Sequence, residues 1–145
     1  MSDIGALLFL IGRILFPLGV LIAGTTFHIA KSPMAEGYAK QMRFPIPAIA
    51  GWPTGIWMIV GSLSVIFGVW GDVGALMIAA FVIPAAAWFH RFWELDDPQQ
   101  KQTQNIFFFR NVALLGGSLI LFAVFTTVGH DLSFTLTDPL FDLSL

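Results

Sequence analysis

The chain has 145 residues, of which 57% are hydrophobic and 11% are charged, and its formal net charge is −2. A soluble domain of this size carries charge on about a quarter of its residues, so the composition indicates an integral membrane protein. The absence of cysteine excludes disulfides, thiol redox chemistry and cysteine metal sites, and no basic face predicts nucleic-acid binding.

Four apolar stretches are long enough to cross a membrane, because about 20 helical residues span roughly 30 Å of hydrocarbon. They cover about residues 4–29, 48–70, 73–93 and 106–128. The first lacks the basic start of a cleaved signal peptide, so we expect it to be retained. The sequence predicts an all-α membrane protein with a four-helix antiparallel bundle over residues 1–128. An apolar C-terminal tail, residues 129–145, is expected to lie at the membrane interface or on a partner subunit.

The basic residues predict the orientation of this bundle. Six of the seven Lys and Arg residues lie between or border spans one and two, or spans three and four. Lys and Arg are enriched in cytoplasmic loops of membrane proteins. We therefore expect the loops at 30–47 and 94–105 in the cytoplasm and both termini on the outer side.

Two further local features are predicted within this framework. Pro17 and Pro84 fall inside spans, where each removes a backbone donor and favours a kink. In the first loop, Met34, Tyr38 and Met42 recur at helical spacing, which favours a short interfacial helix.

Few polar side chains lie near the spans, and these carry the functional prediction. One group occupies the predicted cytoplasmic ends of spans one, three and four: His28, His90, Arg91, Arg110 and Asn111. If the three helices touch, these side chains converge on a site walled by aromatic rings, including Trp88 and Trp93.

Three interpretations of this group remain open. Imidazole and amide groups suit the carbonyl oxygens of a quinone head group, whereas Arg91 and Arg110 suit a lipid phosphate. His, Arg and Trp are also common anchors at a membrane interface. Two helix-end histidines alone do not indicate haem ligation. We expect no catalytic residue, no metal site and no covalently bound cofactor.

Arg13 is the other unusual residue, because it lies about two turns inside span one. An unpaired guanidinium at that depth costs several kcal/mol unless it reaches the surface or an anion. Asp72 and Asp131 are its nearest expected partners, since the spans contain no midspan acid. We expect a structural charge pair for Arg13 in preference to substrate binding.

Five fragments, taken in order and spacing, resemble one known family. They are Gly12–Leu15, Ala23–His28, Phe44–Ala48, Phe89–Trp93 and Phe109–Gly117. Together they resemble the DoxX family of small bacterial membrane proteins. The resemblance implies a four-helix bundle in the bacterial cytoplasmic (inner) membrane. It also implies a link to oxidoreductases, since some members are associated with quinone-linked oxidation of thiosulfate.

One position departs from the family pattern. Where the family often has a glutamate in span two, this chain has Trp57. The change removes a partner for Arg13 and any proton transfer at that position, so it weakens an enzymatic interpretation. An indole instead suits contact with a lipid, a quinone tail or a neighbouring subunit.

Three functional hypotheses follow. The favoured one is a noncatalytic accessory subunit of a larger membrane complex that handles electrons or quinones. The second is a quinone-binding subunit of an oxidoreductase, which uses His28, His90, Arg110 and Asn111 for the head group. The third is a carrier of a small solute or lipid, which the absence of a midspan polar path disfavours.

Overall fold

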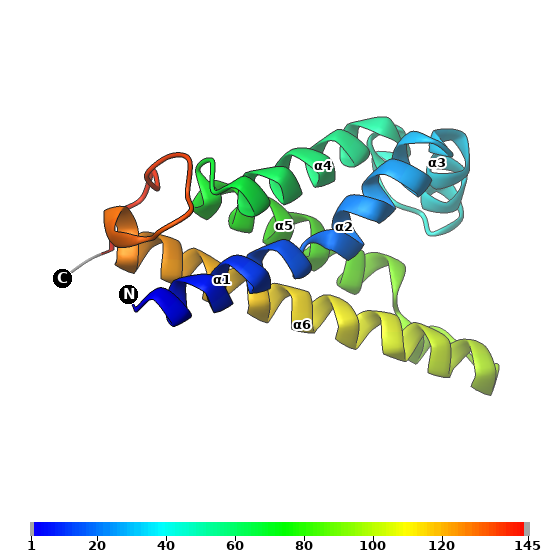
Figure 1. Cartoon of the computed structure of the whole chain (residues 1–145). Coiled ribbons are helices and arrows are strands. Elements are labelled where there is room, and N and C mark those ends of the chain that lie inside the picture. Colours follow the sequence, from blue (N-terminus) through cyan, green and yellow to red (C-terminus); the bar gives the residue numbers. More distant parts are fainter. Residues whose placement is uncertain (1, 144–145) are drawn as a thin grey trace.

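The structure is a computed structural model that describes residues 2–143, and its helices run along one long axis (Figure 1). The first span consists of α1 (Asp3–Leu15), α2 (Leu18–Ala23) and the π-helical segment η1 (Gly24–Ile29). α4 (Trp52–Phe67), α5 (Gly71–Pro84) and α6 (Pro98–Val128) form the other three helices of the bundle. The predicted helical membrane bundle is confirmed.

The helix lengths differ from the predicted spans. Three stretches are long and apolar enough to cross a membrane, namely Asp3–Ile29, Gly71–Glu94 and Pro98–Asp131. α4 is shorter than the predicted 48–70, because residues 47–50 form a 3-10 turn, η2 (Pro47–Ala50), and Gly68 ends the helix with φ of 63°. α6 begins well before residue 106, because the Asp97 carboxylate caps the amide of Gln100 at 2.9 Å.

Both predicted proline effects are present. Pro17 separates α1 from α2, and Pro84 ends α5 immediately before the π-helical η3 (Ala85–Phe89). In η1, the hydroxyl of Thr26 donates to the carbonyl of Ile22 at 2.7 Å, which satisfies an acceptor where the helix widens. Two of the spans therefore change from α to π geometry near the same end of the bundle.

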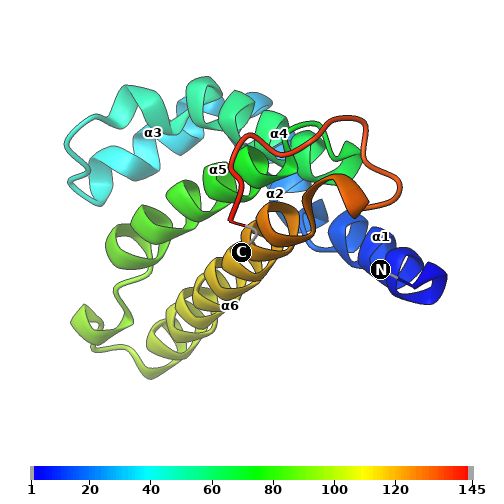
Figure 2. The ribbon, with the colours of Figure 1, turned by 90° about the vertical axis from the view of Figure 1, so that its left-hand side faces the viewer.

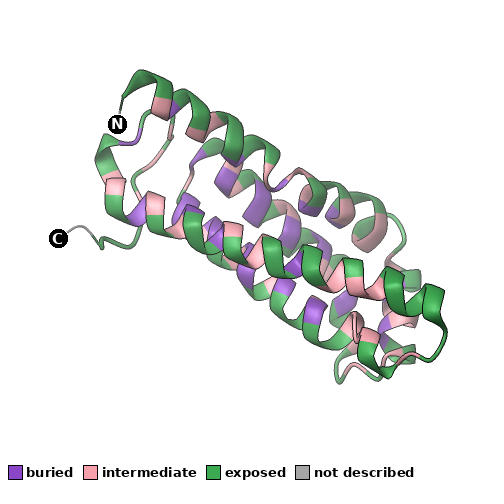
Figure 3. Cartoon of the chain, turned by 90° about the horizontal axis from the view of Figure 1, so that it is seen from below, coloured by how far each residue is buried: buried purple, intermediate pink, exposed green. Residues whose placement is uncertain are grey.

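α5 is the central helix, since it packs against both α4 and α6, while α2 and η1 pack against α4. Glycines allow the closest approach: a Cβ added at Gly61 would lie 3.0 Å from the side chain of Met77. Figure 3 shows that buried residues face neighbouring helices and exposed residues face outward. Many of the outward residues are large and apolar, as a helix bundle in lipid requires.

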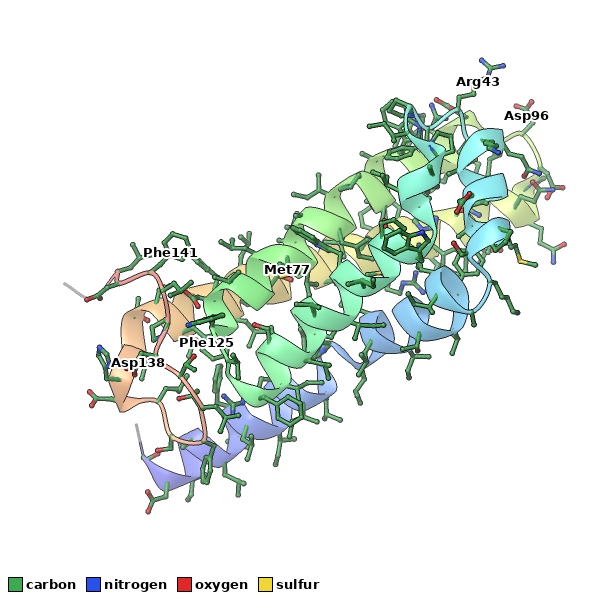
Figure 4. All side chains as sticks on the ribbon, turned by 90° about the horizontal axis from the view of Figure 1, so that it is seen from above. Arg43, Met77, Asp96, Phe125, Asp138 and Phe141 are labelled. Carbon is green, nitrogen blue, oxygen red and sulfur yellow. The ribbon has the colours of Figure 1, made fainter. Side chains whose placement is uncertain are left out.

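The two ends of the bundle differ. One end carries α3 (Ser32–Gln41) and the short 3-10 turn η4 (Phe92–Glu94), and we call it the α3 end. The short helix predicted in the first loop is thus present, and its position at the membrane interface stays a prediction; Met34 is exposed, and the buried face of α3 consists of Ala35 and Ala39. The opposite end, the termini end, carries the start of α1 and the segment after α6 (Figures 1 and 2). Figure 4 shows Arg43 at the α3 end and Asp138 at the termini end.

The C-terminal segment, residues 132–143, packs on its own bundle after the 3-10 turn η5 (Gly129–Asp131). The amides of Leu136 and Thr137 donate to the carbonyl of Gly68 at 3.2 and 3.1 Å. The ring of Phe141 packs against Phe122 with centroids 5.8 Å apart. Leu136 is still 71% exposed, so contact of this segment with membrane or partner stays a prediction.

Arg13 and Asp72 do not form the expected ion pair. Within residues 2–143, ion pairs join Arg91 to Glu94 and His130 to Asp138. Arg13 is 1% exposed, and its Nη2 donates to the backbone carbonyl of Phe134. Its Nε and Nη1 have no hydrogen-bond partner in the described part of the chain.

Asp72 is fully buried and also binds the C-terminal segment. Its Oδ2 accepts hydrogen bonds from the amides of Leu140 and Phe141, both at 2.8 Å. Asp72 lies in the first turn of α5, where the helix dipole favours a negative charge. Each of these two buried side chains therefore bonds to backbone groups of the C-terminal segment instead of pairing with the other.

Candidate functional site: a polar cavity inside the bundle

A cavity of about 700 Å³ lies toward the α3 end, between α2–η1, α4, α5–η3 and α6. Four of the seven predicted ligand-binding residues line it: His28, His90, Arg110 and Asn111. We call it the polar cavity and define it by these four residues. The helices that carry them meet around one space, as the prediction required.

His28 is positioned by η1 and by a bond to the next element along the chain. Its Nδ1 lies 2.5 Å from the carbonyl oxygen of Ala50 in η2. Because a carbonyl only accepts, Nδ1 carries the proton of the neutral ring, and Nε2 is left as an acceptor. The ring packs edge-on against Phe27 and Phe81, at centroid distances of 5.2 and 6.0 Å. His28 is therefore held in one orientation from two sides.

His90 follows η3 directly, at the point where the helical backbone ends. Its Nδ1 lies 2.7 Å from Oε1 of Gln104, an acceptor on α6, so Nε2 of the neutral ring is again free to accept. The ring also packs against Phe107 with centroids 5.5 Å apart. Both histidines thus form a hydrogen bond to the protein through Nδ1. The Nε2 atom of each has no partner within residues 2–143.

Asn111 and Arg110 present donors from α6. Asn111 is 3% exposed, and its Nδ2 has no hydrogen-bond partner in the described part of the chain. Arg110 is exposed, and its guanidinium lies 4.9 Å from the centre of the Phe107 ring. No ion pair of Arg110 forms within residues 2–143. The residues that line the polar cavity therefore include one buried amide donor, on Asn111, and two imidazoles whose Nε2 has no partner within residues 2–143.

The other three predicted residues lie outside the polar cavity. Trp88 and Arg91 line a second cleft of about 810 Å³ beside η4, and Trp93 lines neither space. The indole of Trp88 donates to the carbonyl of Met42 at 3.0 Å, and Arg91 is paired with Glu94 at 3.1 Å. Trp93 packs against Phe108 of α6 instead, with ring centroids 5.6 Å apart.

Several aromatic residues that line the polar cavity were not predicted as site residues, among them Trp57 and Tyr38. Trp57 lines its α4 side, and the indole Nε1 donates to the carbonyl of Met77 on α5 at 2.8 Å. Tyr38 of α3 lines both the polar cavity and the second cleft. The helical spacing of Met34, Tyr38 and Met42 was a signal for α3 as an element, but it did not show which side chain faces the bundle.

Tyr38 separates the two spaces. Its hydroxyl donates to the carbonyl of Phe89 at 3.3 Å, and the two rings lie 5.8 Å apart. Burial raises the pKa of Tyr38 above its ordinary value, so the neutral phenol persists at physiological pH. The wall between the polar cavity and the second cleft is thus a neutral aromatic pair.

The fold defines a helical membrane protein whose cavity has largely apolar walls and a few converging polar groups. The family model described as DoxX matches residues 8–91, more than half of the chain, and the protein belongs to the DoxX family. His28 and His90 lie within the matched residues, whereas Arg110 and Asn111 lie beyond them. No curated protein and no solved structure matches the chain.

Proposed function

We propose that the protein binds the head group of a quinone in the polar cavity, as a noncatalytic subunit of a larger electron-transfer complex in the bacterial cytoplasmic membrane. One observation carries the proposal: Asn111 lines the polar cavity, and its side-chain amide Nδ2 is buried without a hydrogen-bond partner within residues 2–143. A buried donor without a partner costs about 1–3 kcal/mol. The carbonyl oxygen of a quinone is an acceptor that would remove this cost.

The histidines fit the reduced form of the same ligand. A quinol carries hydroxyl groups in place of carbonyl oxygens, and a hydroxyl can donate to the free Nε2 of His28 or His90. Asn111 and Arg110 remain donors for the oxidised form. The apolar and aromatic wall, which includes Phe81 and Trp57, suits a planar ring in either state.

A lipid phosphate fits less well. Phosphate recognition in proteins generally uses several charge-assisted hydrogen bonds from Arg or Lys. Arg110 is the one Lys or Arg residue among the described residues that line the polar cavity, and it is exposed. Arg91, which the sequence suggested as a second cation, is paired with Glu94 outside it. A neutral head group is therefore the better match.

The proposed subunit role rests on the lack of a recognisable redox group in the sequence. The chain has no cysteine and no nucleotide-binding motif, so electrons for a bound quinone must come from a partner with its own redox group. If the basic loops face the cytoplasm, the polar cavity opens toward the cytoplasmic half of the bilayer. The partner would then meet the α3 end or the exposed aromatic residues beside it, such as Trp93 and Phe109.

The experiment is a titration of the purified protein with a tail-free benzoquinone, followed by quenching of tryptophan fluorescence. Trp57 lines the polar cavity, so binding there should give saturable quenching. Asn111→Leu should weaken binding about tenfold, because it removes a hydrogen bond to the ligand. Asn105→Leu on the same helix, outside the polar cavity, is the matched control and should bind as wild type does. Equal affinity in all three proteins, or no saturable quenching, would refute the proposed function.

A further inference from the structure

The polar cavity reaches the surface between α2 and α6, where its lining residues Gly19 and Arg110 are both exposed. α2 packs against α4, and α6 packs against α5. The first span meets α6 through the rings of Phe9 and Phe125, whose centroids lie 5.4 Å apart, and at Gly117, where an added Cβ would lie 2.3 Å from the ring of Phe16. From there, α2 and α6 diverge toward the α3 end, as both Figure 1 and Figure 2 show.

The edges of this opening belong to membrane-spanning segments. On α2, Gly19 lines the polar cavity, is exposed, and has no neighbouring atom within 4 Å of the position of a Cβ. On α6, the facing residues of the polar cavity are Arg110, Asn111 and Leu114. Gly19 and Leu114 lie within the stretches Asp3–Ile29 and Pro98–Asp131, both apolar enough to cross a membrane. Both edges of the opening therefore belong to helices that are long and apolar enough to cross a membrane.

The opposite side of the polar cavity is bridged. Trp57 spans from α4 to α5 through its hydrogen bond to the carbonyl of Met77 at 2.8 Å. Toward the α3 end, Tyr38 and Phe89 form the wall to the second cleft. Within residues 2–143, no hydrogen bond or ring contact joins α2 to α6 across the gap between them.

From this geometry we infer that the gap between α2 and α6 is a lateral portal, through which the ligand enters from the lipid and in which its apolar chain remains. The inference rests on the proposed function, since it assigns the chain of the ligand whose head group binds in the polar cavity. It narrows the ligand class to quinones that carry an alkyl or prenyl chain. The polar head lies near Asn111, and the chain passes Gly19 and Leu114 into the bilayer.

Photo-crosslinking locates the chain directly. The probe is a benzoquinone with a decyl chain that ends in a diazirine, added to the protein in phospholipid vesicles and mapped by mass spectrometry. Crosslinks on residues 16–23 of the first span and 110–119 of α6 are expected, and excess decyl benzoquinone without the diazirine should abolish them. Crosslinks concentrated on the lipid face of α4 and α5, for example at Ile56 and Ile83, would overturn the portal.

A matched pair of variants tests the route of entry. Gly19→Trp places an indole in the portal, whereas Gly12→Trp places one on the same span at a position that is also exposed, has open space around it and lies outside the polar cavity. Association of the decyl benzoquinone with vesicle-embedded protein should slow about tenfold in Gly19→Trp and stay unchanged in Gly12→Trp. Equal rates in both variants would exclude this route.

The two proposals fail in different ways. If tail-free benzoquinone does not bind wild-type protein, the proposed function fails. If it binds with the predicted dependence on Asn111, but the chain crosslinks elsewhere and Gly19→Trp does not slow association, the portal alone fails.

Discussion

Asp72→Ala removes the buried carboxylate that holds the C-terminal segment on the bundle. In the native protein, Oδ2 accepts hydrogen bonds from the amides of Leu140 and Phe141, both at 2.8 Å. A hydrogen bond to a charged group contributes about 1.5–3 kcal/mol, so the two bonds contribute about 3–6 kcal/mol before other terms.

Two further properties of Asp72 change this value, one lowering it and one raising it. Oδ1 of Asp72 is buried without a partner in the described part of the chain, so its removal returns part of its desolvation cost. The carboxylate also interacts favourably with the N-terminal end of α5, which adds about 0.3–1 kcal/mol to the loss. We expect a net destabilisation of about 2–4 kcal/mol, which corresponds to a fall of roughly 5–15 °C in the unfolding midpoint.

The assay is thermal unfolding in mild detergent, with Asp72→Asn as the matched variant. Asparagine keeps an oxygen that can accept both amides but has no charge, so its midpoint should fall about half as far as that of Asp72→Ala. Limited proteolysis should cut residues 132–143 first in Asp72→Ala. An unchanged midpoint in Asp72→Ala, or equal midpoints in the two variants, would refute the assignment of Asp72 as an acceptor for this segment.

Three other variants test separate parts of the structure. Arg13→Met should leave the unfolding midpoint unchanged or raised, because the buried guanidinium has two unpaired nitrogens and no carboxylate partner within residues 2–143; a clear fall would show that its bond to Phe134 outweighs this cost. Gly117→Leu should destabilise by about 1–3 kcal/mol because its side chain meets Phe16, while Gly116→Leu, with open space around it, should not; equal midpoints would contradict the contact. Burial raises the pKa of Tyr38 above 10.0, so its contribution to stability is full below that pH and is lost as the pH rises through the folded-state pKa. Unfolding midpoints measured from about pH 8 to about pH 11 should therefore fall less steeply in Tyr38→Phe than in wild type, and parallel curves would contradict this.

The helices could be predicted well from the sequence, because the length of an apolar stretch and the effect of a proline depend only on neighbouring residues. Pro17 and Pro84 lack a backbone donor wherever they occur, so the interruptions at these positions followed from the sequence alone. The start of α6 was missed because the turn that begins at Pro98 is polar and depends on a cap from Asp97, not on hydropathy.

Part of the candidate site could be predicted from the sequence, because hydropathy locates the ends of the spans. His28 and His90 were assigned to the same end of the bundle from their positions at the ends of spans, and they do line one cavity. The direction of Trp88 depends on the π-helical geometry of η3, because one extra residue per turn rotates every later side chain. The sequence placed Trp88 in the aromatic run at the end of the third span, and in the structure its side chain lines the second cleft.

The C-terminal segment shows what hydropathy does not reveal. Asp72 was expected to pair with a charge, but its partners are backbone amides of Leu140 and Phe141, which every residue type carries. No residue pattern distinguishes such a segment from one that lies free on the membrane. Only the three-dimensional path of the chain shows where these donors bond.

The central claim is that the free amide of Asn111 bonds to a carbonyl of a quinone, and side-chain amide NMR tests it most directly. In selectively labelled protein, adding decyl benzoquinone should move the Nδ2 resonances of Asn111 downfield, because the donor gains an acceptor, while those of Asn105 stay in place. Saturating quinone that leaves the Asn111 amide unchanged would contradict the proposed site.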